Sequence, residues 1–255
     1  MINESLIEEF KSYALSEYPR EAVAIVNSNT TLVTFVNNHE SPKTDFLVKD
    51  SDLAPYLTTM THVLHSHTCE NVSTVVPGLP PDCPSGMDIE TQIAMSVPWA
   101  IFLCDKTVVI DPFWFGDFTL EEELVGKKFR FGVNDCYSAI RSWYFKNRGI
   151  TLVDFSRDWN FWKDTTNNLY LDNYTKAGFE AISKDEAEPG DVILMKIGGA
   201  KVPNHGAIFV GRGLMYHHPS PTPALGRRTT QSLSRIEPIA GRLPYITHVL
   251  RYNAS

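Results

Sequence analysis

The sequence has few cysteines, no long apolar run and no excess of basic residues. Four cysteines in 255 residues are too few and too scattered for a disulfide framework, which favours synthesis in a reducing cytosol. No apolar run approaches the length of a membrane span. The formal net charge of −7 argues against unspecific binding to nucleic acid or to an anionic membrane surface.

The N-terminal stretch MINESLIEEF also lacks the basic start and apolar centre of a secretory signal, so no signal peptide is expected. What is present is ordinary for a folded protein, with 43% hydrophobic and 21% charged residues. The length suits one large domain or two modest ones, each able to bury a core. No internal repeat is found.

Residues 1–119 predict a mixed α/β domain whose sheet is mixed or mostly antiparallel. Apolar residues at helical spacing indicate a helix over the first 20 residues, ended by Pro19. Further helices are expected at 51–60, capped by Ser51, and at 84–97. Short β-branched runs predict strands at 21–26, 31–36, 45–50, 61–67 and 98–104, and a hairpin partner at 106–112.

We place a domain boundary near residue 120, within a connector that mixes aromatic residues, glycines and charges. Residues 120–255 predict an α+β domain, in which a helix is followed by an antiparallel sheet. The helix covers 135–149, is capped by Asn134 or Asp135, and ends at Gly149. Residues 150–185 indicate helix and loop. Strands are expected at 192–197, 206–210, 214–218 and 246–252.

Two histidines lie two residues apart on a predicted strand. His65 and His67 therefore point to the same face, where two imidazoles can bind one zinc ion. Downstream, Ser85 can cap a helix and Asp88, one turn in, leans back toward the same end. Its carboxylate is a candidate third ligand, which leaves the fourth position of a tetrahedral zinc site open for water. Glu21, at the start of the first strand, is available as a base.

Other interpretations of these residues are open. A histidine pair on a strand is often a surface feature, and Ser-x-x-Asp is a common helix start. A closed site with two histidines, Cys69 and Cys83 is a rival. The loop at 68–84 could cover the metal, supply ligands, or serve as a docking arm for a neighbour.

The order Glu, H-x-H and S-x-x-D resembles the JAMM (MPN) metallopeptidases. This resemblance implies that His65, His67 and Asp88 hold zinc, that Glu21 is the general base, and that Ser85 helps to stabilise the oxyanion. The sequence departs from the family motif in its longer gap between the histidines and the serine. Thr68 also stands where the family usually has proline.

A second group centres on Cys136, which follows Asp135 at the first turn of the predicted helix. That position favours the thiolate, because a helix N-terminus carries partial positive charge. A nucleophilic cysteine needs a base that the fold brings in, and a third group orients the base. His205 stands at the mouth of a strand, and two adjacent histidines, 217 and 218, lie on the next. A buried structural cysteine is the alternative.

The hairpin between these strands decides which histidine meets His205. A two-residue turn, Arg212-Gly213, places His218 on the face of His205, whereas a three-residue loop, 211–213, places His217 there. The glycine at the end of the loop favours His217.

The order Asp-Cys, EPGDVILM, NHGAIFVG and a later histidine resembles the NlpC/P60 cysteine peptidases over about residues 125–252. The resemblance implies that Cys136 is the nucleophile, His205 the general base and His217 the orienting residue. The family often has a tyrosine upstream of the nucleophile. Here that region offers only Phe129 and Phe131.

A JAMM-like domain followed by an NlpC/P60-like domain resembles the tail-tip, or tail assembly, protein K family of lambda-like bacteriophages. The resemblance covers nearly the whole chain, including HSH, PSGMDIETQIAMSVPWAIF and FGVNDCYSAIRSWY. It implies one zinc ion, partners among the tail-tip and hub proteins, and a location in the host cytoplasm and then in the virion tail tip. The implied activity is hydrolysis of peptidoglycan peptides at genome entry, or of a tail protein during assembly. The alternative is a structural tail-hub protein whose peptidase sites are inactive or dispensable.

Overall fold

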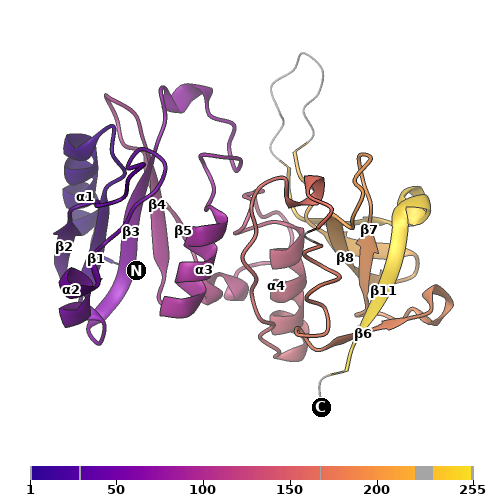
Figure 1. Ribbon diagram of the computed structural model, residues 1–255. Coiled ribbons are helices and arrows are strands. Elements are labelled where there is room, and N and C mark those ends of the chain that lie inside the picture. The colour runs from indigo at the N-terminus through magenta and orange to yellow at the C-terminus, as the bar shows by residue number, and fades with distance from the viewer. Residues whose placement is uncertain (1, 29, 167, 222–231, 254–255) are drawn as a thin grey trace. The chain divides into compact units, whose positions relative to one another are not determined.

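The computed structural model describes all residues except 1, 29, 167, 222–231 and 254–255 (Figure 1). The chain divides into two compact units. One comprises residues 1–84 and 90–119, and the other comprises residues 85–89 and 120–255. Among the described helices, none has the length and apolar character needed to cross a membrane.

The first unit contains a five-stranded sheet in the order β2-β1-β3-β4-β5. β3 and β4 run parallel, and the other neighbours are antiparallel, so the expected mixed sheet is confirmed. The strands are β1 (Val23–Asn27), β2 (Thr31–Phe35), β3 (Met60–Thr68), β4 (Trp99–Cys104) and β5 (Phe113–Phe115).

Helix α1 (Glu4–Glu17) covers one face of this sheet (Figure 1). Its buried residues Leu6, Phe10 and Ala14 pack against alternate strand residues, and the rings of Phe10 and Phe102 lie 4.6 Å apart. Since strand residues alternate between faces, Leu64 points toward α1 while its neighbours in β3 at odd positions point to the opposite face.

Several expected elements of the first unit are wrong in detail. Residues 45–50 form no strand before α2 (Asp50–Leu53), because the backbone there bonds the Asn37 side chain, which accepts from Leu47 N–H and donates to the Asp45 carbonyl. α2 has Lys49, not Ser51, at its N-cap and gives way to a 3-10 turn. The hairpin partner of β4 is β5, while 106–112 contributes only an isolated bridge at Val109. α3 (Gly86–Met95) forms as expected.

The second unit contains a six-stranded sheet in the order β10-β9-β8-β7-β11-β6, and every neighbouring pair is antiparallel. The α+β class with its antiparallel sheet is therefore confirmed. Sequence analysis missed β6 and β10. In the described part of 150–185, the expected helix is limited to 3-10 turns. The strands are β6 (Phe179–Ile182), β7 (Val192–Met195), β8 (His205–Gly211), β9 (Leu214–His217), β10 (Arg235–Pro238) and β11 (Ile246–Tyr252).

Helix α4 (Cys136–Arg148) packs against β8. It ends at Gly149, whose φ of 66° lies in the left-handed region that glycine adopts without strain. On β8, a Cβ atom at Gly206 would lie only 2.7 Å from Ile140 Cδ1 and 3.0 Å from Tyr170 Oη. Glycine at this position therefore allows the helix and a tyrosine to approach the strand closely.

Candidate functional site

Cys136 is the first residue of α4, and Asp135 is its N-cap. The Asp135 carboxylate accepts a bond from the Ser138 N–H at 2.8 Å, which settles the choice between Asn134 and Asp135 as cap. The same carboxylate is buried against Arg157, whose Nε lies 2.8 Å away. The capped helix start thus holds the thiol in a fixed position.

His205 opens β8 and meets His217 on β9, with Nε2 of the first 2.7 Å from Nδ1 of the second. The turn has two residues, since Gly211 pairs with Leu214, yet the partner is His217. A bulge between Phe209 and Gly211 adds one residue to β8 and reverses which face each β9 residue takes. The expected partner is correct, but a bulge rather than a longer loop produces it.

The thiol and the two histidines line one cleft of about 140 Å³. The backbone N–H of Gly206, the residue after His205, acts to lower the pKa of the Cys136 thiol. The rest of the lining is rich in rings, which suits apolar parts of a bound peptide. The aromatic lining residues are Phe129, Phe131, Trp159, Phe161 and Trp162.

The electrostatics of the cleft differ from the expectation of a thiolate at the helix start. Burial and the Asp135 charge raise the pKa of Cys136 to about 11, despite hydrogen bonds from Tyr170 and Gly206. Burial and the neighbouring His217 hold the pKa of His205 well below its usual range. The resting pair is therefore a neutral thiol and a neutral imidazole, and the thiol must lose its proton to a base when it attacks.

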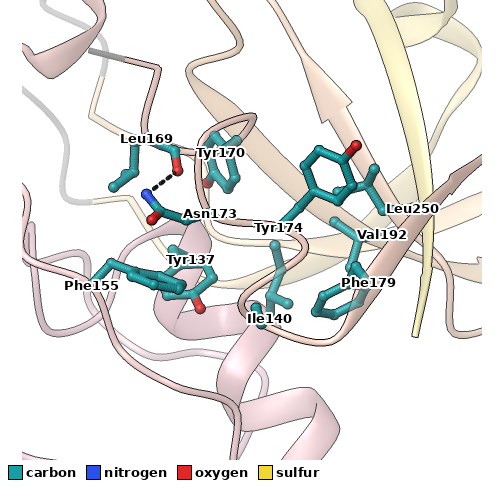
Figure 2. Close-up of a pocket in the computed structure, with 11 residues that line it drawn as sticks. Tyr137, Ile140, Phe155, Leu169, Tyr170, Asn173, Tyr174, Phe179, Val192 and Leu250 are labelled. Carbon is teal, nitrogen blue, oxygen red and sulfur yellow. Dashed lines mark hydrogen bonds between the residues drawn. The ribbon is translucent and has the colours of Figure 1, made fainter. Parts of the chain in front are cut away.

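Sequence analysis missed a tyrosine at the nucleophile. Tyr170 Oη lies 3.1 Å from Cys136 Sγ. A tyrosine that follows α4 in the sequence therefore supplies a hydroxyl at the thiol, whereas the residues before Cys136 offer only Phe129 and Phe131. Its loop is braced by Asn173 Nδ2, which donates to the Leu169 carbonyl, and its ring borders a small apolar cavity (Figure 2). Only the three-dimensional fold brings residue 170 to the cysteine, so no local sequence signal could have identified it.

Tyr170→Phe is expected to slow alkylation of the Cys136 thiol. The hydroxyl lowers the pKa of the thiol, so its removal decreases the thiolate fraction by about threefold to tenfold, the equivalent of one ordinary hydrogen bond. The rate of iodoacetamide labelling at pH 8, followed by mass spectrometry of the Cys136 peptide, measures the effect. Tyr174→Phe, on the same loop, is the control. Equal rates in wild type and Tyr170→Phe would show that the contact does not affect the thiol.

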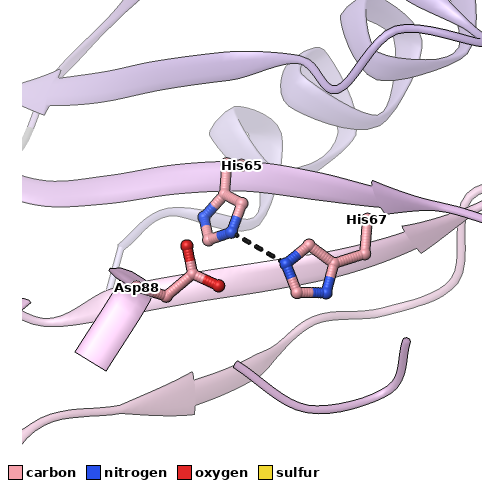
Figure 3. Close-up of side chains that lie close together, drawn as sticks. All are labelled: His65, His67 and Asp88. Carbon is pink, nitrogen blue, oxygen red and sulfur yellow. Dashed lines mark hydrogen bonds between the residues drawn. The ribbon is translucent and has the colours of Figure 1, made fainter. Parts of the chain in front are cut away.

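Strand β3 and the first turn of α3 bring together the predicted metal ligands. His65, His67 and Asp88 are buried and each offers a ligand atom within 4.8 Å of the others (Figure 3). The two histidines extend from β3, and the aspartate from the first turn of α3. Figure 3 shows all three side chains converging on one point.

The donor atoms fit a zinc ion. The two Nε2 atoms lie 3.2 Å apart, close to the separation of about 3.3 Å for two nitrogens bound tetrahedrally to zinc at roughly 2.0–2.1 Å. Nδ1 of His67 lies 2.8 Å from the Pro81 carbonyl. Donation to that carbonyl places the proton on Nδ1 and leaves Nε2 as a ligand, the usual arrangement behind a metal-bound histidine. The loop at 68–84 therefore supplies a carbonyl that orients His67.

The remaining predicted residues of this site are placed nearby. Glu21 is buried two residues before β1, whose first residue, Val23, pairs with His65. Ser85 Oγ donates to Asp88 Oδ2 at 2.8 Å and accepts from the Asp88 N–H at 3.1 Å. The serine thus caps α3 and holds the aspartate.

The rival site with two cysteine ligands is not assembled. In the part of the chain that the structure describes, the groups of three or more potential ligands include neither Cys69 nor Cys83. Cys69 Sγ lies 3.6 Å from the Cys104 carbonyl. The open three-ligand arrangement is therefore the one that the geometry favours.

Comparison with known proteins shows what the second unit is similar to. The model of the NlpC/P60 family matches residues 126–233. This match contains Cys136, His205 and His217, and it confirms the resemblance to this family that the sequence predicts.

The chain is homologous to proteins named tail tip assembly protein K. It is 36% identical to that of Escherichia phage lambda over 134 residues, or 52% of this chain and 62% of the lambda protein. It is 24% identical to that of Escherichia phage N15 over 228 residues, or 85% of each chain. The predicted resemblance to the protein K family is thereby confirmed. The lambda match spans less than two thirds of that relative.

Solved structures of NlpC/P60 proteins also match. One from Staphylococcus aureus subsp. aureus Mu50, described as similar to lipoprotein, gives a TM-score of 0.35 at 19% identity and covers 55% of this chain and 43% of its own. One from Bacillus cereus ATCC 10987 gives a TM-score of 0.34 at 14% identity. The match covers 95% of this chain and 67% of the Bacillus cereus chain.

Proposed function

We propose that the protein is a phage tail-tip component whose second unit is a cysteine peptidase. The observation that carries this proposal is the shared cleft, in which the thiol at the start of α4 and the bonded pair of His205 and His217 line one space. The names of the homologous proteins support a place in the tail tip, with other tail-tip and hub proteins as partners.

Each polar residue of the cleft has a separate role in the proposed reaction. His205 accepts the Cys136 proton as the thiol attacks a carbonyl carbon, and it returns the proton to the leaving amine. His217 orients the base and shares the charge that forms on it. The first N–H groups of α4 and the Tyr170 hydroxyl are the donors available to the oxyanion. Water then releases the acyl group from sulfur.

The proposed substrates are the peptides of peptidoglycan during genome entry, or a tail protein during assembly. Digestion of purified peptidoglycan, followed by mass spectrometry of the released fragments, tests the first substrate and identifies the bond that is cut. New amine and carboxyl ends are expected. Intact peptidoglycan together with an uncut set of tail proteins would instead favour a structural tail-hub protein.

A second activity, that of a zinc metallopeptidase, is proposed for the site formed by His65, His67 and Asp88. Its support is the convergence of two imidazoles and one carboxylate, with His67 oriented by the loop carbonyl. His65, His67 and Asp88 would hold the ion, which supplies a Lewis acid for amide hydrolysis. Glu21 is proposed as the general base, and the Ser85 hydroxyl, held by Asp88, as an oxyanion donor.

His65→Ala is expected to lower zinc affinity by at least about a hundredfold, because even groups behind a ligand contribute tenfold to a hundredfold. Wild type is expected to retain about one zinc ion per chain. Equilibrium dialysis with elemental analysis measures binding without reference to activity. His62→Ala is the control, since His62 lies on β3 but points to the face of the sheet opposite to that of His65 and His67.

Two outcomes would contradict the zinc proposal. One is equal zinc content in wild type and His65→Ala, and the other is no specific zinc in wild type. Cobalt substitution adds a check on the ligands, because strong thiolate-to-cobalt absorption would indicate Cys69 or Cys83 rather than a carboxylate.

A further inference from the structure

Behind the two histidines of the cysteine site lies a carboxylate. Strand β10 pairs with β9 so that Arg235 lies opposite His217 and Glu237 lies opposite Met215. Glu237 is therefore a diagonal neighbour of His217 on the same face of the sheet. Its Oε1 lies 3.1 Å from His217 Nε2, a buried atom that makes no aligned hydrogen bond with any of the described residues.

Arginines hold Glu237 in its charged form. Arg235 Nε lies 2.7 Å from Oε2, and an Arg242 terminal nitrogen lies 3.5 Å from Oε1. Partial burial by itself would raise the pKa of Glu237, but the bond from Arg235 and the neighbouring positive charges lower it below its ordinary value. At neutral pH the group that faces His217 Nε2 is thus a carboxylate, which can only accept a hydrogen bond.

This acceptor decides where the protons of both histidines lie. A neutral imidazole carries one proton, and a carboxylate at Nε2 of His217 places that proton on Nε2. Nδ1 of His217 is then an acceptor, so His205 must donate to it from its own Nε2 across the 2.7 Å contact. Nδ1 of His205 is left without a proton, as a general base requires.

We propose that Glu237 is a positioning residue that fixes the tautomers of His217 and His205, so that the free lone pair of His205 lies on Nδ1. The catalytic part of this inference rests on the proposed peptidase function, and the tautomer part does not. Without the carboxylate, His217 can equally carry its proton on Nδ1 and donate it to His205 Nε2. His205 then carries its own proton on Nδ1, and that nitrogen can no longer act as the base.

The other charged groups around the pair do not supply this constraint. Asp135 is bonded to Arg157 and to the start of α4. Arg242 and Arg235 are donors, which cannot accept the His217 proton. His218 is buried against the Phe129 ring, and its burial lowers its pKa to about 4, so it is neutral.

Glu237→Gln tests the proposal, because an amide can donate to His217 Nε2 and so favours the other tautomer. Nitrogen-15 spectra of the histidine rings in the full chain report the protonated nitrogen directly. In wild type, both His205 and His217 are expected to carry their protons on Nε2. In Glu237→Gln, both histidines are expected to carry them on Nδ1. Glu237→Asp keeps a carboxylate and is expected to restore the wild-type pattern. Glu188→Gln, at an exposed ion pair with Arg251, is the matched control.

Activity provides the second measurement. Glu237→Gln is expected to lower kcat by about tenfold to a hundredfold with little change in KM, as for other groups that orient a histidine. Unchanged tautomers in Glu237→Gln would overturn the proposal, and so would altered tautomers with an unchanged kcat. If wild type hydrolyses no substrate but the tautomers shift as expected, the peptidase function fails while the role of Glu237 in fixing the tautomers stands.

Discussion

Cys136→Ala is expected to reduce peptide hydrolysis by at least about a thousandfold. The thiol is the only sulfur in the cleft formed with His205 and His217 among the described residues, and covalent catalysis cannot proceed without it. Cys136→Ser keeps the shape and a hydrogen-bonding group, but its hydroxyl is a far weaker nucleophile, so it should be nearly as inactive. The initial rate of release of new amine groups from peptidoglycan measures the loss.

The control for this experiment is Cys69→Ala, a cysteine of the first unit that the cleft does not include. It is expected to hydrolyse at the wild-type rate. Hydrolysis retained in full by Cys136→Ala would exclude the cysteine mechanism. The same result combined with loss of activity on zinc removal would assign the activity to the site formed by His65, His67 and Asp88.

Arg157→Met is expected to destabilise the second unit by about 3–5 kcal/mol, because it leaves a buried carboxylate without its counter-charge. Arg157 and Asp135 are both almost inaccessible and lie 2.8 Å apart. The arginine also donates to the Gly132 carbonyl and to Ser138 Oγ, so several bonds around the start of α4 are lost together. Urea unfolding followed by circular dichroism measures the change.

Lys146→Met on the same helix is the matched control. Lys146 pairs with the exposed Glu123 at 3.8 Å, and surface pairs of this kind contribute about 0–1 kcal/mol. A loss from Arg157→Met as small as that from Lys146→Met would show that the buried pair does not stabilise the helix start.

The pH dependence of this effect follows from the sign of the shift at Asp135. Burial by itself would raise the pKa of Asp135, but Arg157 and the backbone N–H donors hold it below its usual value. The pair therefore stabilises the folded protein fully above about pH 4, the usual range for a free aspartate, and this contribution is lost as the pH falls through the folded value. The difference between wild type and Arg157→Met should accordingly be largest near neutral pH.

Residues that belong to regular elements could be predicted from the sequence. Period-two geometry placed His65 and His67 on one face of β3, and cap chemistry placed Cys136 at the start of α4. Both predictions depend only on local rules of strand and helix geometry. Glu21 is also at a predictable position, since it lies at the start of an expected strand.

Residues whose placement depends on loops or on register could not be predicted. The bulge near Val210 changes which histidine meets His205, and nothing in the local sequence indicates it. Tyr170 and the Pro81 carbonyl reach their sites through irregular chain, which follows tertiary contacts rather than a periodic pattern. Strand β10 was not expected at all, so Glu237 could not be connected with His217 before the fold was known.

The thiolate predicted for Cys136 was wrong for a related reason. The helix start was identified correctly, but burial of the thiol depends on the whole cleft and outweighs the local effect of the helix.

The central claim, that Cys136 is the nucleophile of a peptidase site, is tested most directly by trapping the acyl-enzyme. Wild-type protein turning over a peptidoglycan fragment is quenched rapidly in acid, digested and analysed by mass spectrometry. The account predicts an acyl group on the peptide that contains Cys136, lost on treatment with hydroxylamine and absent from Cys136→Ala. Rapid hydrolysis with no acyl group on that peptide, or with the group on another residue, would contradict it.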